Sequence, residues 1–188
     1  NGKAIPSKME EVLALLQSIK GYSLAARVRD NFISEKQLAS PEIMFSVRFL
    51  RPNLTHSMDL YYGAWAVLDP TRNMVDAFEC TDGKPWGESP LTVRPDESIL
   101  YGNDDALKKA ERAKMFMNRD RRLYESVNHS MMANFVDDGF KDEEVQVNES
   151  NNKGPTGFSA LKYVQPTDVT PRYSTVSDAD IVVLRYAH

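Results

Sequence analysis

The chain has 188 residues, 41% of them hydrophobic, so it is long enough to bury one substantial core. Its formal net charge of −4, with scattered basic residues, gives no electrostatic footprint for nucleic acid and disfavours polyanionic partners. The single cysteine, Cys80, excludes an internal disulfide and a cysteine-based zinc motif, and favours a small buried side chain.

The two ends of the sequence indicate a fragment. No window approaches the roughly 18 apolar residues of a transmembrane helix, and Asn1 is not followed by the basic start and apolar core of a signal peptide. The first residues run straight into a helical pattern, and residues 181–188 stop inside an apolar run. A signal or lipid anchor is therefore expected upstream of Asn1.

The first predicted element is an amphipathic helix over residues 7–20. Ser7 and Glu10 fit a capping box at its start, and apolar side chains then recur at helical spacing. Gly21 supplies a stop signal at its C-terminal end. A half-buried strand is predicted over residues 43–49, because apolar and polar residues alternate there.

Two more helices are predicted in the middle of the chain. Asp69 and Pro70 read as an N-cap and a first-turn proline, and the Asp82–Gly83 turn ends the segment. The apolar stripe of this helix consists of Met74, Val75 and Phe78. Residues 104–117 begin with acids and carry bases later, which matches the helix macrodipole.

The last part of the chain is polar and rich in proline and glycine. Residues 137–178 are predicted to form long loops, interrupted at most by a short strand near Leu161 to Val164. Loops of this length are uncommon in compact domains unless they bind a ligand or are disordered.

The sequence contains no recognisable catalytic or metal-binding motif. Its histidines, His56, His129 and His188, are far apart, and each is expected to be solvated or structural. No serine occupies a nucleophile elbow, and no glycine-rich phosphate loop precedes a helix. The acidic run at 137–139 does not fit a calcium loop, because valines stand at ligand positions. We therefore expect no enzymatic activity, no metal and no cofactor.

Several short motifs occur in a fixed order along the chain. They are SPEIMFSV at 40–47, PTRNMVDAFE at 70–79 with the turn DGKP at 82–85, NRDRRLY at 118–124, TGF at 156–158, KYV at 162–164 and LRYA at 184–187. In order and spacing these motifs resemble the carboxy-terminal region of the SusD/RagB family of nutrient-binding proteins. Arg121 replaces the usual proline of the third motif, which affects only the local turn. Arg119, Asp120 and Arg122 are expected to tie this loop to the core rather than to bind a ligand.

The resemblance implies a mainly helical fold with long irregular loops and a few short strands. In this family, tetratricopeptide-like helix pairs pack against an irregular carboxy-terminal part. Residues 1–40 would be the tail of the helical scaffold, and residues 41–188 an incomplete carboxy-terminal region. Family members are lipid-anchored at the outer membrane, on the cell surface of Gram-negative bacteria. They lie over a TonB-dependent transporter of the SusC type and perform no chemistry.

By the same resemblance, the expected function is capture of an oligosaccharide or polysaccharide for import by a SusC-type transporter. A peptide-binding RagB-like member or a protein-docking scaffold is the alternative, and a groove lined by unpaired backbone groups would favour peptide. A glycoside hydrolase would need two positioned carboxylates, which the 27 acidic residues do not identify.

Sugar recognition requires flat aromatic platforms for the C–H faces of pyranose rings. The candidate ligand-binding residues are Tyr61, Tyr62, Trp65, Trp86 and Tyr101. Tyr61 and Trp65 would share one face of a helix, although Trp65 fits a core position equally well. Trp86 follows Pro85 in a turn and is expected to face solvent.

Overall fold

The computed structural model describes residues 6–64, 68–100, 105–128, 158–165 and 175–187. In chain order the elements are α1 (Pro6–Ser18), the 3-10 helix η1 (Val28–Phe32), α2 (Ser34–Gln37), β1 (Ile43–Val47), the π-helix η2 (Leu60–Ala64), α3 (Arg72–Ala77), α4 (Glu97–Leu100), α5 (Asp105–Lys114), α6 (Arg121–Tyr124), β2 (Val127–Asn128), β3 (Ser159–Ala160) and β4 (Ile181–Arg185). The predicted class, mainly helical with a few short strands, is confirmed.

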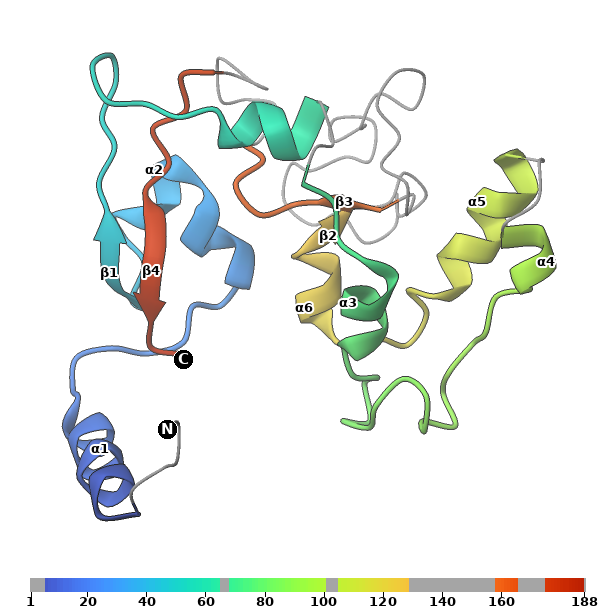
Figure 1. The fold of residues 1–188 in the computed structure, drawn as a ribbon, viewed down its shortest axis with the longest axis horizontal. Coiled ribbons are helices and arrows are strands. Elements are labelled where there is room, and N and C mark those ends of the chain that lie inside the picture. Colours follow the sequence, from blue (N-terminus) through green and yellow to red (C-terminus); the bar gives the residue numbers. More distant parts are fainter. Residues whose placement is uncertain (1–5, 65–67, 101–104, 129–157, 166–174, 188) are drawn as a thin grey trace.

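The strands form two small antiparallel sheets. β1 pairs with β4, so that Ile43 lies opposite Arg185 although the two are far apart in sequence. β2 pairs with β3, and Val127 lies opposite Ala160. The β1–β4 sheet lies beside α2 on one side of the molecule, while α3, α6 and the β2–β3 sheet occupy its centre (Figure 1). In the same view α4 and α5 lie on the other side, and α1 stands apart.

Buried apolar side chains form three clusters among the described residues. The first contains Val75, Leu100, Met115, Phe116, Leu123, Val127 and Phe158. The second contains Ile33, Leu161 and Val164, and the third contains Phe32, Tyr163 and Ala179. Tyr62 packs against the second and third clusters, which connects η2 to η1 and to the end of the chain.

Several predicted features are confirmed. α1 covers most of the predicted helix at 7–20, and Gly21 after it has a φ of 86°, which glycine adopts at little cost. α5 lies within the predicted helix at 104–117, and Cys80 is buried. No residue of α1 is buried, so its apolar side chains are exposed. Among the described helices, none is long and apolar enough to span a membrane.

β1 is shorter than the predicted strand, and two of its apolar side chains are exposed. The strand ends at Val47, and Phe45 and Val47 are 59% and 47% exposed. Asp180 holds the segment that follows, because its carboxylate accepts the Phe49 N–H at 2.9 Å and pairs with Arg48 Nε at 2.8 Å. The alternation identified a strand, but it could not say which of its faces the rest of the chain covers.

α3 begins later than predicted. Its N-cap is Thr71, whose Oγ1 accepts a hydrogen bond from the Met74 N–H at 3.2 Å. Val75 is buried as expected, but Met74 is exposed and Phe78 is half-buried. Asp69, the predicted N-cap, instead has both carboxylate oxygens buried without a hydrogen-bond partner among the described residues. This desolvation raises the pKa of the Asp69 carboxyl from 3.8 to about 6.

Replacing Asp69 by asparagine should stabilise the full-length protein near pH 7.5 by about 1 kcal/mol, because burial disfavours the ionised form and solvent moderates the effect. The folded-state pKa is raised, so the contribution of this carboxyl to the free energy of unfolding is fully present below about pH 4 and is lost as the pH rises through about 6. The advantage of Asp69→Asn should therefore shrink toward pH 4.

Thermal melts at the two pH values measure this difference, with Glu10→Gln on the exposed surface of α1 as the matched control. The control should show no such pH dependence. If Asp69→Asn were less stable than the wild-type protein near pH 7.5, the carboxylate would have a stabilising partner and this expectation would be wrong.

The short strand expected near Leu161 to Val164 occurs slightly earlier, as β3. Residues 161–164 form a turn, in which Tyr163 has a φ of 64°. A positive φ is uncommon for a bulky residue, and such conformations persist where surrounding contacts enforce them. Most of the predicted loop region, at 137–157 and 166–174, lies outside the described residues.

Candidate functional site

Tyr61 and Tyr62 lie next to each other on η2 and differ in exposure. Tyr61 is 40% exposed, whereas Tyr62 is half-buried. Of the other candidate platforms, Trp65 and Tyr101 lie outside the described residues. η2 is therefore the part of the described structure where candidate aromatic residues come together.

Tyr62 is fixed by a series of aromatic contacts. Its ring stacks on Tyr163, with centroids 6.3 Å apart and an angle of 19° between the ring planes. Tyr163 in turn meets the edge of Phe32, with centroids 5.1 Å apart. The Tyr163 hydroxyl also accepts the Val182 N–H at 2.9 Å, and burial raises the pKa of this phenol. Tyr62 thus anchors η2, and Tyr61 is the neighbour that reaches the surface.

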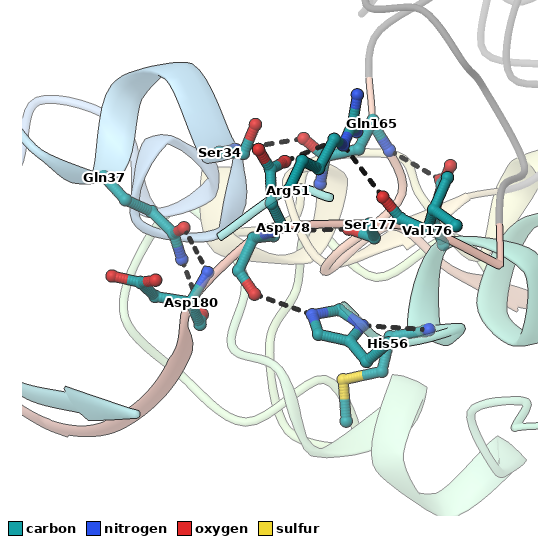
Figure 2. Close-up of polar contacts among 12 residues, drawn as sticks. Ser34, Gln37, Arg51, His56, Gln165, Val176, Ser177, Asp178 and Asp180 are labelled. Atoms are coloured by element: carbon teal, nitrogen blue, oxygen red, sulfur yellow. Dashed lines mark hydrogen bonds and ion pairs between the residues drawn. The ribbon is translucent and has the colours of Figure 1, made fainter. Parts of the chain in front are cut away.

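A buried polar contact fastens the start of η2 to the 161–165 segment. Asp59 is fully buried, and its Oδ1 accepts the Gln165 N–H at 2.9 Å. The Gln165 side chain donates to the Phe32 and Tyr163 carbonyls. It also accepts the Ser34 N–H at 3.0 Å (Figure 2). Each polar atom of the Gln165 amide is therefore used, which holds η1, η2 and the turn in one arrangement.

His56 has a structural role on the chain segment that leads into η2. Its Nδ1 accepts the Met58 N–H at 3.1 Å, so its Nε2 carries the proton and donates to the Ala179 carbonyl at 2.6 Å. The backbones of His56 and Ser177 exchange two further hydrogen bonds, and Figure 2 shows the ring pointing toward the 177–180 segment. Both ring nitrogens are occupied, which confirms the structural interpretation of this histidine.

The 176–180 segment is held from several sides. Arg51 Nε donates to the Val176 carbonyl at 2.8 Å, and the same side chain pairs with Asp178 at 3.3 Å. Gln37 exchanges two hydrogen bonds of 2.7 Å with the backbone of Asp180 (Figure 2). These contacts make the 176–180 segment a rigid part of the scaffold.

Trp86 is not exposed, and the expectation that it faces solvent is wrong. Its side chain is only 5% exposed, and its indole Nε1 is buried without a partner among the described residues. The guanidinium carbons of Arg72, Arg94 and Arg119 lie 5.7, 5.3 and 5.3 Å from the ring centre. Cations favour aromatic faces, so the turn folds inward against them. In this chain the ring is unavailable as a sugar platform.

Arg119 explains why the NRDRRLY segment is structural. It is 1% exposed, and its guanidinium donates to the carbonyls of Met115, Val75 and Phe78 at 2.7, 2.6 and 2.7 Å. These carbonyls lie at or near the ends of α3 and α5, where helix carbonyls lack intrahelical partners. Burial lowers the pKa of this guanidinium, which still remains protonated.

The replacement of proline by Arg121 has a local explanation. Asp120 is the N-cap of α6, and its carboxylate accepts the Arg122 N–H at 2.7 Å. Arg121 is therefore the first residue of the helix, a position where proline is favoured but not required. Its Nε pairs with Glu125 at 2.7 Å, which stabilises the same turn.

The described residues offer no metal site. They contain no group of three or more His, Cys, Asp or Glu side chains that could hold an ion. His129 and His188 lie outside the described residues.

Comparison with known proteins identifies the family. The sequence model of the SusD family matches residues 37–188, which is most of the chain. The chain belongs to the SusD family. The SusD motifs of the sequence fall within the matched range, and the comparison with curated proteins found no match.

Two solved SusD-like structures from Bacteroides fragilis share the fold. The chain is 15% identical to one described as a SusD-like carbohydrate binding protein, with a TM-score of 0.62 over 96% of this chain and 33% of that protein. It is 18% identical to the other, with a TM-score of 0.52 over 97% of this chain and 38% of that protein. The chain thus spans about a third of the length of these SusD-like proteins.

Sequence reasoning missed the residues that support η2 within this SusD fold. Tyr163 belongs to the KYV motif, which carries the family resemblance but does not itself indicate a contact with η2. No local sequence pattern marks Asp59 and Gln165 as partners, because their hydrogen bond joins positions 106 residues apart. The positive φ of Tyr163 likewise has no sequence marker.

Proposed function

We propose that this chain is part of a non-catalytic, lipid-anchored protein of the outer membrane that captures oligosaccharides at the cell surface. A TonB-dependent transporter of the SusC type would then import them. The observation that carries this proposal is the match to the SusD family over residues 37–188. One solved structure with the same fold is described as a carbohydrate binding protein, which favours sugar over peptide.

The proposed platform is Tyr61 together with Tyr62, its neighbour on η2, and Trp65 and Tyr101 remain candidate contacts outside the described residues. Tyr61 is exposed, while the residues around it on η2 are anchored by the Tyr62–Tyr163 stack and the Asp59–Gln165 hydrogen bond. A rigidly mounted aromatic ring stacks on the apolar face of a pyranose with little loss of conformational entropy.

Screening the full-length protein against neutral and acidic oligosaccharides and peptides by titration calorimetry tests the proposal. We expect saturable binding of at least one oligosaccharide and no release of reducing ends on prolonged incubation. Binding only to peptides would assign the protein to the RagB-like alternative. Cleavage of the oligosaccharide by protein that is free of contaminating enzymes would show that the protein is a hydrolase.

Tyr61→Ala should weaken binding of the oligosaccharide found in the screen by about 1–3 kcal/mol, by analogy with aromatic platforms that stack on bases. The melting temperature should change little, because Tyr61 is exposed. Tyr22→Ala is the matched control, since Tyr22 is also 40% exposed but lies between α1 and η1. If the Tyr61 and Tyr22 variants bound the oligosaccharide with equal affinity, Tyr61 would not be part of the binding site.

A further inference from the structure

Lys162 is a half-buried cation to which the described part of the chain offers no acidic partner. Its Nζ lies 5.1 Å from the centre of the Phe32 ring, and the side chain forms no hydrogen bond or ion pair with the described residues. A lysine at a surface turn ordinarily extends its ammonium group into water. Here the ammonium is partly withdrawn from water, and burial together with the neighbouring Arg185 charge lowers its pKa.

Arg185 brings a second cation to the same ring. Its guanidinium carbon lies 5.5 Å from the centre of Phe32, and its side chain is 14% exposed. Both cations therefore lie against one aromatic ring. Like charges that are held near one another repel unless an anion lies nearby.

The carboxylate that pairs with Arg185, Glu42, is already fully engaged. Its Oε1 accepts from Arg185 at 2.8 Å, while its Oε2 accepts from Asn31 and from the Ala25 N–H, both at 2.9 Å. Glu42 is buried and neutralises Arg185, which leaves the charge of Lys162 uncompensated. A partly desolvated and uncompensated ammonium is costly in a folded protein, and such groups are typical of ligand sites.

We propose that Lys162 binds a single carboxylate on the captured saccharide, such as that of a uronic acid. The identity of the ligand as a saccharide rests on the proposed function. The uncompensated charge amounts to one cation, and the chain carries a net charge of −4, so one carboxylate fits better than a polyanion.

The position of Lys162 relative to η2 supports this assignment. Tyr62, Tyr163 and Phe32 form a continuous series of ring contacts, and Lys162 lies at its Phe32 end. The same turn therefore supports the proposed aromatic platform through Tyr163 and presents the cation through Lys162.

The test compares an oligosaccharide containing one glucuronic acid with the same oligosaccharide after reduction of its carboxyl group. The wild-type full-length protein should bind the acidic probe about tenfold more tightly, as expected for one charge-assisted hydrogen bond. Lys162→Met keeps the apolar stem, and it should abolish this preference while leaving affinity for the reduced probe unchanged. The matched control is Lys84→Met in the exposed turn that follows Gly83, which should keep the preference.

A second measurement does not depend on oligosaccharide binding. Free glucuronate, but not glucose, should protect Lys162 from an amine-labelling reagent and leave Lys84 unprotected. Protection without binding of either oligosaccharide would keep the carboxylate site and refute the proposed function. Equal affinities for the two oligosaccharides, with no protection by glucuronate, would refute the carboxylate site and keep the proposed function. A lower melting temperature of Lys162→Met with the preference retained would show that Lys162 only packs on Phe32.

Discussion

Trp86→Ala should destabilise the full-length protein by about 3–5 kcal/mol, the usual cost of truncating a large buried aromatic residue. Trp86 is 5% exposed, and its ring fills the space among Arg72, Arg94 and Arg119. The variant would leave a cavity and would also remove the aromatic face that these three cations share.

Chemical denaturation of the full-length protein measures this change, with Tyr22→Ala as an exposed aromatic control. Affinity for the oligosaccharide should stay the same wherever the variant remains folded. A small change in stability together with a large loss of affinity would contradict the buried position of the ring and return Trp86 to the list of candidate platforms.

Arg119→Met should cost a similar amount, about 3–5 kcal/mol, because the substitution leaves three buried carbonyl groups without their donor. Arg122→Met, in the same motif, is the matched control. Arg122 is exposed and pairs with Asp120 and Glu79 at the surface, so its loss should cost less than about 1 kcal/mol. Denaturation midpoints that rank the two variants in the opposite order would refute the structural role of Arg119.

The losses of stability caused by Trp86→Ala and Arg119→Met should not be additive. Arg119 lies 5.3 Å from the Trp86 ring centre, so each variant already removes part of what the other would remove. The double variant should therefore be more stable than the sum of the two changes predicts, by about 0.5–3 kcal/mol. Strict additivity would mean that the guanidinium and the ring act independently.

Local signals in the sequence predicted elements well where the decisive contacts are local. The helical period and Gly21 located α1, and the charge gradient located α5. The position of Trp86 could not be predicted in this way, because Arg72 and Arg119 reach its ring from distant parts of the chain. A turn that contains proline and glycine is predicted to be exposed whether or not distant arginines pack against its aromatic residue.

In the candidate site, too, local features could be predicted from the sequence and distant contacts could not. Adjacent tyrosines on a short helix can be read from the sequence, and Tyr61 is indeed exposed. The sequence could not show that Tyr62 would stack on Tyr163, since that contact depends on how the 161–164 turn packs against η2. The binding roles of Tyr61, Tyr62, Trp65 and Tyr101 remain predictions for the calorimetric test.

The pairing of β1 with β4 has a consequence for folding during synthesis on the ribosome. Glu42 and Arg185, which clamp this sheet, are 143 residues apart, so a ribosome working at about 5–20 residues per second completes β4 roughly 7–30 s after β1. During that interval β1 is an unpaired edge carrying Phe45 and Val47, which is a template for association with other nascent chains. Chains that stop before residue 181 should therefore aggregate more readily than chains that include β4.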